Sequence, residues 1–143
     1  MIILDTNVLS ELLRPSPAGQ VEAWLSAQDG TQVYFTAIGE AELRHGVAIR
    51  PAGKRRAELS NAIEGMLGDD FRDRILPFDR AAARAYASIA AERRAAGRPI
   101  SQFDYQICAI ARANDAVIAT RNTADFEGCG VALVDPWGAP AAS

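Results

Sequence analysis

The chain has 143 residues, of which 49% are hydrophobic and 23% are charged. This balance is typical of one globular domain that buries its own core, and it excludes an intrinsically disordered chain. The formal net charge of −3 argues against a broad nucleic-acid-binding surface, but it does not exclude a nuclease whose acidic site is offset by bound cations.

No apolar run approaches the roughly 18 residues that are needed to span a bilayer, and no secretory signal pattern surrounds the first apolar residues. The two cysteines, Cys108 and Cys129, are too few for a disulfide scaffold, and their spacing fits no zinc motif. We therefore expect a soluble, cytoplasmic protein that has no contact with a membrane.

Hydrophobic periodicity predicts strands and helices that alternate along the chain. In chain order, we expect a strand at 2–4, helices at 8–14 and 20–28, a strand at 33–35, helices at 37–49 and 54–68, a strand at 75–78, helices at 80–96 and 101–113, and strands at 116–119 and 131–134. Pro77 favours an edge position for the third strand.

Continuous apolar strands between helices are typical of a mostly parallel sheet that is covered on both faces. We expect one α/β domain over residues 1–137, a three-layer α/β/α arrangement around a central, mostly parallel five-stranded sheet. Residues 138–143 are predicted to form a flexible tail.

Asp5 is the first polar residue after the first predicted strand. In parallel α/β sheets, ligands bind at the carboxyl ends of the strands, because the loops there open a crevice. An aspartate at this place can also simply cap the following helix. Asp5 alone leaves both interpretations open.

Glu40 and Glu42 follow the second strand, in the first turns of the predicted helix. Residues that are two positions apart in a helix lie about 200° apart around its axis, so Glu40 and Glu42 cannot both point at one site. Either acid could also be present only because acids near a helix start interact favourably with the helix dipole. The residues alone do not choose between them.

Asp104 lies three residues after Ser101, a spacing that approximates a capping box. Asn122 and Asp125 follow the fourth strand, where turn residues are common. Each of these polar residues therefore has a structural interpretation as well as a functional one.

Taken together, the acids favour a shared site. Asp5, Asn122 and Asp125 follow strands, and Glu42 and Asp104 lie near the starts of helices, all on the same expected rim of the sheet. Converging carboxylates repel one another unless a cation compensates them. Hard oxygen ligands suit Mg²⁺ or Mn²⁺, ions that activate water and stabilise charge on a phosphate.

Four motifs in this order resemble those of one family. They are Leu4-Asp5-Thr6-Asn7-Val8, Ala41-Glu42-Leu43-Arg44 with Gly46-Val47, Asp104 in its apolar helix, and Ala119-Thr120-Arg121-Asn122-Thr123-Ala124-Asp125-Phe126. Over nearly its whole length, the chain resembles the PIN-domain ribonucleases, specifically the VapC-like toxins of bacterial toxin–antitoxin pairs. The closing Val134-Asp135-Pro136-Trp137 is similar to the subgroup called FitB-like.

The resemblance implies that Asp5, Glu42 and Asp104 bind the metal, Mg²⁺ or Mn²⁺, and it selects Glu42 rather than Glu40. Many relatives have an aspartate where this chain has Asn122, so the fourth position departs from the family pattern. Asn122 could ligate through its carbonyl or hold a water, and Asp125 could supply the missing carboxylate or stabilise the turn.

Three further residues are candidates for lesser roles. The Thr6 hydroxyl follows Asp5 into the crevice and could orient a ligand or a water. Thr120 and Arg121 could contact a phosphate, although an arginine on an exposed turn is as often only solvated.

The resemblance implies a metal-dependent endoribonuclease that hydrolyses RNA phosphodiester bonds as the toxin of a toxin–antitoxin pair. It also implies a homodimer that a cognate antitoxin protein inhibits. Hydrolysis by water would leave a 5′-phosphate and a 3′-hydroxyl, whereas attack by the RNA's own 2′-hydroxyl would leave a cyclic phosphate.

Two other functions fit parts of the pattern. A phosphoryl-transfer domain could use Asp5 as its nucleophile. However, a phosphatase of the haloacid dehalogenase type would have an aspartate in place of Asn7, and a receiver domain would have a lysine far beyond Lys54, the last lysine of this chain. A non-catalytic module could keep the acids for a partner's arginines, and metal titration would distinguish it because such a module need not bind Mg²⁺.

Overall fold

Five strands pair in parallel in the computed structural model, which describes residues 1–138. The strands are β1 (Ile2–Leu4), β2 (Val33–Thr36), β3 (Ile75–Leu76), β4 (Val117–Ala119) and β5 (Leu133–Val134). Their order is β3-β2-β1-β4-β5, so β1 is central and β3 is at an edge, as Pro77 predicts. Because every strand runs in the same direction, all carboxyl ends meet at one rim of the sheet.

Helices connect the strands. They are α1 (Thr6–Leu12), α2 (Gly19–Ser26), α3 (Ala37–Ala48), α4 (Lys54–Gly65), α5 (Arg80–Ala95), α6 (Gln102–Ala113) and α7 (Thr123–Phe126), with a 3-10 turn at Gly30–Gln32 and a π-helical turn at Met66–Asp70. Within residues 1–138, no helix combines the length and the apolar character needed to cross a membrane.

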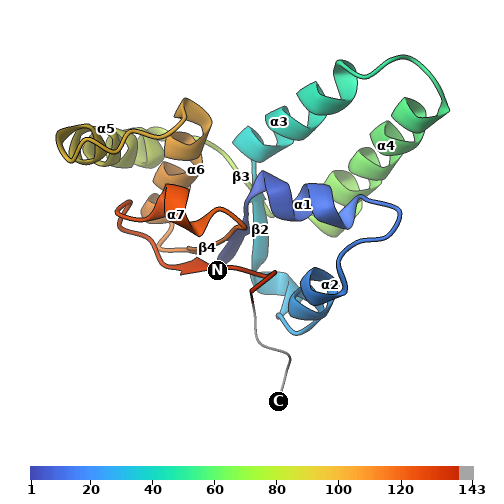
Figure 1. Ribbon diagram of the computed structural model, residues 1–143, viewed down its shortest axis with the longest axis horizontal. Coiled ribbons are helices and arrows are strands. Elements are labelled where there is room, and N and C mark those ends of the chain that lie inside the picture. The colour runs from blue at the N-terminus through green and yellow to red at the C-terminus, as the bar shows by residue number, and fades with distance from the viewer. Residues whose placement is uncertain (139–143) are drawn as a thin grey trace.

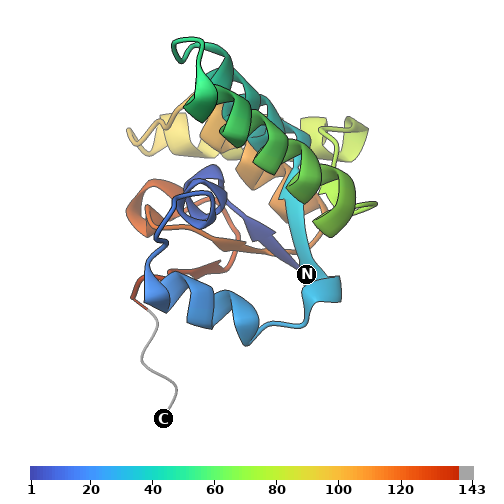
Figure 2. The ribbon, with the colours of Figure 1, turned by 90° about the vertical axis from the view of Figure 1, so that its right-hand side faces the viewer.

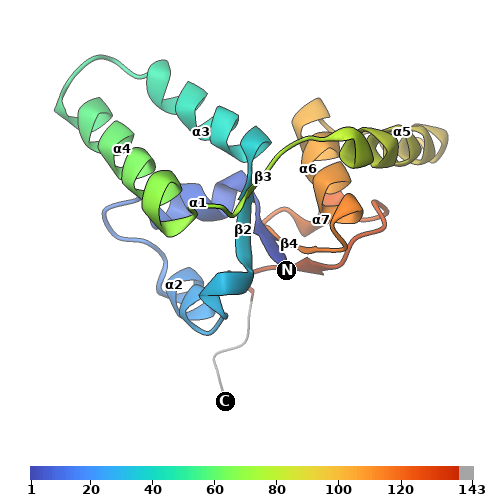
Figure 3. The same ribbon diagram turned by 180° about the vertical axis from the view of Figure 1, so that it is seen from behind.

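Alternate residues of each strand face opposite sides of the sheet, which creates two cores. Ile3 and Ile118 pack with residues of α5, α6 and α7, whereas Leu4, Phe35 and Ala119 pack with residues of α1, α2, α3 and α4. Figure 1 and Figure 3 show α5 and α6 on one side of the central strands and α3 and α4 on the other. The predicted three-layer α/β/α arrangement is therefore confirmed, and its sheet is entirely parallel.

Helices α3 and α4 form a hairpin whose two members lie side by side (Figure 2). Leu43 of α3 and Ile63 of α4 lie in the same core. On the exposed surface, Arg44 forms ion pairs with Glu40 on its own helix and with Glu64 on α4. This helical hairpin begins at the carboxyl end of β2 and extends away from that rim of the sheet.

The carboxyl-terminal part of the chain departs most from expectation. Residues 123–126, for which no helix was predicted, form the short helix α7. The last strand starts at Leu133 instead of 131, after a loop in which Gly128 and Gly130 adopt φ values of 80° and 73°. The predicted tail, 138–143, lies outside the described residues except for Gly138, so the domain limit at 137 stays a prediction.

Two glycines of α3 provide a matched test of how tightly β2 packs on this helix. A Cβ at Gly39 would lie 2.5 Å from the Phe35 ring, which is fully buried, whereas a Cβ at Gly46 would meet nothing within 4 Å. We expect Gly39→Ala to lower the free energy of unfolding by about 1–3 kcal/mol through overpacking. Gly46→Ala should raise it by up to about 1 kcal/mol through helix propensity.

Urea unfolding of both variants and the wild type measures these two changes. A Gly39→Ala protein that is at least as stable as the wild type would contradict the packing of α3 on Phe35 described above.

Candidate active site

Asp5 lies at the carboxyl end of the central strand β1, and its side chain is buried. One carboxylate oxygen, Oδ1, accepts a hydrogen bond from the Thr6 amide at 2.8 Å and so caps α1. The other, Oδ2, accepts a hydrogen bond from the Thr120 hydroxyl at 2.8 Å. Asp5 is therefore a helix cap and a residue of the site at once, and the two interpretations of its position do not compete.

The Thr120 hydroxyl is the centre of a network that joins β1 to β4. Besides its bond to Asp5, it accepts hydrogen bonds from the Asn122 amide at 3.1 Å and from Asn7 Nδ2 at 3.4 Å. Thr120 is completely buried, so the expectation that it contacts a phosphate was wrong. Its role is to fix Asp5 and the start of the following loop.

Glu42 reaches the site from α3, whose first turn is capped by the Thr36 hydroxyl. Its Oε1 accepts a hydrogen bond from the Thr6 hydroxyl at 2.8 Å, so Thr6 orients this glutamate. Glu40 instead accepts a hydrogen bond from Arg44 at 2.7 Å. Of the two glutamates, Glu42 is therefore the one that faces Asp5.

Asp104 lies in the first turn of α6, on the other side of Asp5. The helix is capped by the Ser101 hydroxyl, which accepts a hydrogen bond from the Asp104 amide at 3.2 Å. The expected cap is present, yet the Asp104 side chain is half-buried and lines the same cleft as Asp5 and Glu42. The serine therefore caps the helix, and the Asp104 carboxylate lines the cleft.

The cleft has a volume of about 660 Å³ and is bordered by elements from both sides of the sheet. This volume lies within the range of ligand-binding sites. Thr6 and Asn122 line it together with the three acids, whereas Asp125 is exposed and does not. Asp125 still lies near enough to Asp104 for its charge to raise the pKa of that carboxyl.

Three of the acids that line the cleft, Asp5, Glu42 and Asp104, are destabilised as anions. Burial, supported by the charges of Asp104 and Glu42, raises the pKa of Asp5 to about 6 despite hydrogen bonds from Thr120 and Thr6. Burial also raises the pKa of Glu42 and of Asp104. A cation between the carboxylates would remove this penalty.

The donor set fits a hard, hydrated cation. It consists of carboxylate oxygens with the Asn122 side chain beside them, which are ligands that Mg²⁺ and Mn²⁺ prefer. Among the described residues 1–138, no three or more histidine, cysteine, aspartate or glutamate side chains lie close enough together to hold a metal ion by themselves, so the carboxylates of the cleft form an open arrangement. Mg²⁺ suits such an open arrangement, because it keeps several waters and accepts oxygens of a bound phosphate.

The interpretation of the sequence missed two residues that shape this cleft. Glu11 on α1 is buried and accepts hydrogen bonds from the Ala18 amide at 3.0 Å and from Arg14 at 3.2 Å, which holds the loop between α1 and α2. The spacing of three residues between Glu11 and Arg14 is the signal that would have indicated the pair. Trp137 also lines the cleft, although only its place in a motif was noted.

Comparison with known proteins gives a consistent identification. The PIN domain family model matches residues 2–128. The chain is 44% identical to the VapC ribonuclease Y4jK of Sinorhizobium fredii over 96% of its own length and 98% of that protein, and 42% identical to the toxin FitB of Neisseria gonorrhoeae over 96% and 99%.

The fold agrees with these similarities. A solved structure of FitAB bound to a DNA fragment named IR36 contains a chain that superposes with a TM-score of 0.92 at 40% identity, covering 99% of both chains. The chain therefore belongs to the PIN-domain family, in the group that includes the VapC ribonucleases and the FitB toxin.

Proposed function

We propose that this protein is a metal-dependent endoribonuclease that hydrolyses RNA phosphodiester bonds. The observation that carries the proposal is the meeting of Asp5, Glu42 and Asp104, from three separate elements, in one cleft where burial raises the pKa of each. A cluster of acids that is costly without a cation, in a family that contains ribonucleases, is best explained as a metal site.

In this proposal, Asp5, Glu42 and Asp104 hold Mg²⁺ or Mn²⁺. When bound, the ion supplies positive charge to a phosphate oxygen and lowers the pKa of a water that attacks in line. Asp5 is kept in place by Thr120 and by the α1 amide, and Glu42 by the Thr6 hydroxyl. These bonds fix the carboxylate oxygens before any ligand arrives.

For the fourth position, the geometry favours Asn122 over Asp125. Asn122 lines the cleft, and its amide is fixed by the Thr120 hydroxyl. Asp125 is exposed on α7 and acts on Asp104 only through its charge. We assign to Asn122 the completion of the site and to Asp125 an electrostatic contribution.

The relatives also suggest the biological setting. Solved structures similar to this chain include FitAcB from Neisseria gonorrhoeae. VapBC-5 from Mycobacterium tuberculosis, a member of the VapBC family of toxin–antitoxin systems, resembles this chain in fold. We propose that this chain is likewise the toxin of a toxin–antitoxin pair, a homodimer that a cognate antitoxin inhibits and that acts on RNA in the cytoplasm.

Two alternatives remain distinguishable from the nuclease. Membership of the PIN-domain family argues against a phosphoryl-transfer domain with Asp5 as its nucleophile. A non-catalytic module that keeps the acids for a partner's arginines would bind no metal and cleave no RNA.

Cleavage of labelled RNA tests the proposed activity. The wild type with Mn²⁺ or Mg²⁺ should give discrete fragments with 5′-phosphate and 3′-hydroxyl ends, and EDTA should abolish them. Substitution of a residue that only supports a metal ligand lowers metal affinity or activity about 10–100-fold. Asp5 and Glu42 are proposed as ligands themselves, so Asp5→Asn and Glu42→Gln should each lower the cleavage rate by more than about 100-fold. The fragments and their ends are measured by gel electrophoresis and end-specific labelling.

Glu40→Gln is the matched control for Glu42→Gln. It makes the same change two residues away on the same helix, but at a side chain that pairs with Arg44. This variant should cleave like the wild type. Undiminished cleavage by Asp5→Asn would reveal a contaminating ribonuclease, and cyclic phosphate ends would contradict attack by water.

The raised pKa of Asp5 also predicts how the free energy of unfolding of the metal-free protein depends on pH. The folded pKa of about 6 lies above the ordinary value of 3.8, so the folded protein keeps a proton that the unfolded chain loses. The free energy of unfolding should therefore fall as pH rises from about 4 to 7, by on the order of 3 kcal/mol more in the wild type than in Asp5→Asn.

Urea unfolding in EDTA at a series of pH values measures this difference. Saturating Mn²⁺ at pH 7 should then stabilise the wild type and have a much smaller effect on Asp5→Asn. If the free energy of unfolding changes with pH in the same way in both proteins, the pKa of Asp5 is not raised in the folded state.

A further inference from the structure

Arg121 and Trp137 come together at the mouth of the cleft. The guanidinium carbon of Arg121 lies 5.0 Å from the centroid of the Trp137 ring, and both residues line the cleft with Asp5 and Asp104. We propose that Arg121 binds a phosphate of the RNA strand next to the phosphate that is cut, and that Trp137 is the positioning residue for Arg121. This inference rests on the proposed ribonuclease function.

The electrostatics of the cleft favour such a cation. The metal proposed between the acids would act on the phosphate that is cut, whereas the phosphates on either side of it also carry negative charge, and positive charge on the walls would favour their binding. Three arginines line the cleft, namely Arg14, Arg50 and Arg121. Arg14 is partly neutralised by Glu11 at 3.2 Å, whereas Arg50 and Arg121 form no ion pair within residues 1–138.

The backbone of Arg121 is fixed relative to the acids. Arg121 lies between Thr120, which donates to Asp5, and Asn122, whose amide donates to Thr120. Its own amide donates to Asn7 Oδ1 at 3.5 Å. A phosphate bound to Arg121 would therefore lie at a set place relative to Asp5.

Trp137 restricts the other end of the Arg121 side chain. The Trp137 amide donates to Asp135 Oδ1 at 2.9 Å, the preceding Pro136 is buried, and the tryptophan packs against the core between α1 and the sheet. A guanidinium that is already held over a ring loses less conformational freedom when it binds. Its N–H groups remain able to donate to phosphate oxygens.

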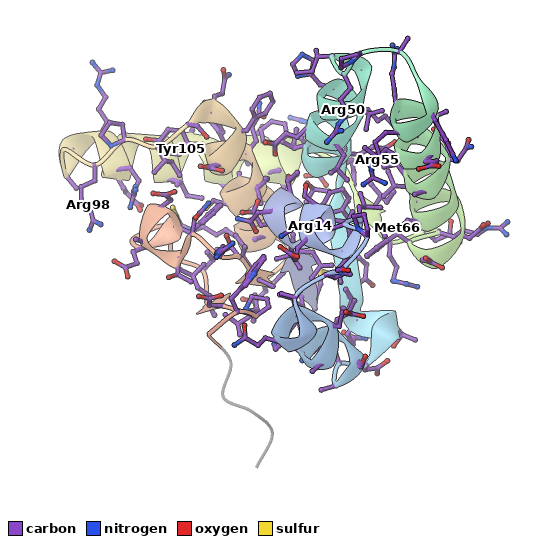
Figure 4. All side chains as sticks on the ribbon, turned by 45° about the vertical axis from the view of Figure 1, so that its right-hand side comes forward. Arg14, Arg50, Arg55, Met66, Arg98 and Tyr105 are labelled. Carbon is purple, nitrogen blue, oxygen red and sulfur yellow. The ribbon has the colours of Figure 1, made fainter. Side chains whose placement is uncertain are left out.

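The two unpaired arginines lie on opposite walls. Arg121 follows β4, whereas Arg50 follows α3, the helix that leaves β2, and β1 with Asp5 lies between these two strands. Figure 4 shows Arg50 on the α3 side, above Arg14 and Arg55. A single strand that crosses the acids would thus meet a positively charged side chain on each side, and proteins that bind single strands commonly use positive charge to follow the backbone.

The test is binding of a short fluorescein-labelled single-stranded RNA, measured by fluorescence anisotropy from about 50 to 200 mM salt. The full chain carries Asp104→Asn as a background, because this change should prevent cleavage and leaves the Asp5–Thr120 contacts intact. Adding Arg121→Ala should weaken binding severalfold and make the slope of log affinity against log salt shallower by about 0.7, the value for one phosphate contact on a single strand.

The Trp137 variants separate positioning from charge. Trp137→Leu should weaken binding while leaving the salt slope nearly unchanged, because the charge of Arg121 remains. Trp137→Phe keeps a ring under the guanidinium and should restore most of the affinity. If both variants bind as the background protein does, the positioning role of Trp137 is overturned.

Arg98→Ala is the control for removal of one positive charge. Arg98 is exposed and lies far from the cleft, beyond α5 (Figure 4). It should change neither affinity nor slope. An Arg121→Ala protein that binds RNA as this control does would overturn the inference, and so would a background protein that binds no RNA. Cleavage of RNA by the wild type would then show that the ribonuclease function stands without the inference.

Discussion

The hydrogen bond from the Thr120 hydroxyl to Asp5 joins the end of the central strand β1 to the end of its neighbour β4, and the whole site depends on it. It fixes a carboxylate that is buried and surrounded by other acids. The same hydroxyl accepts hydrogen bonds from the Asn122 amide and from the Asn7 side chain, so one buried oxygen sets the positions of the loops after β1 and β4. Glu42 is then held through Thr6, which directly follows Asp5.

This arrangement holds close together negative charges that repel one another. Asp5 is fixed after β1, Glu42 by a helix that starts at β2, and Asp104 by a helix that packs on the opposite face of the sheet. Parallel pairing of β1 with β2 and with β4 brings their carboxyl ends to one rim. The free energy that a bound cation would recover by relieving this repulsion is available for binding the cation and, with it, a phosphate.

Much of the fold could be predicted because its causes are local. The strand and helix periods, the cap at Ser101 and the edge position indicated by Pro77 all depend on short stretches of sequence, and each is present in the structure. The short helix α7 could not be predicted in this way. The carbonyls of Asp125 in this helix and of Glu127 directly after it accept hydrogen bonds from the buried Arg93 of α5, a contact between residues more than thirty positions apart in the sequence.

The site was predictable only in part for the same reason. The acids could be found from their places after strands and at helix starts, but the choice between Glu40 and Glu42 depends on Thr6 and Arg44, which lie on different sides of α3. Burial of Thr120 depends on the packing of β4 beside β1, so its neighbours in sequence gave no indication of it. Tertiary contacts therefore decided the roles that local patterns left open.

The most direct test of this account is calorimetric titration of Mn²⁺ into the purified protein near pH 6, in two buffers with different ionisation enthalpies. Because burial raises the pKa of Asp5 to about 6, part of the carboxylate is protonated there, and metal binding should release protons and make the heat depend on the buffer. The account predicts binding with proton release in the wild type, and loss of that binding when Asp5, Glu42 and Asp104 are all replaced by their amides. No binding to the wild type, or equal binding to the triple variant, would contradict the assignment of these three acids as the metal site.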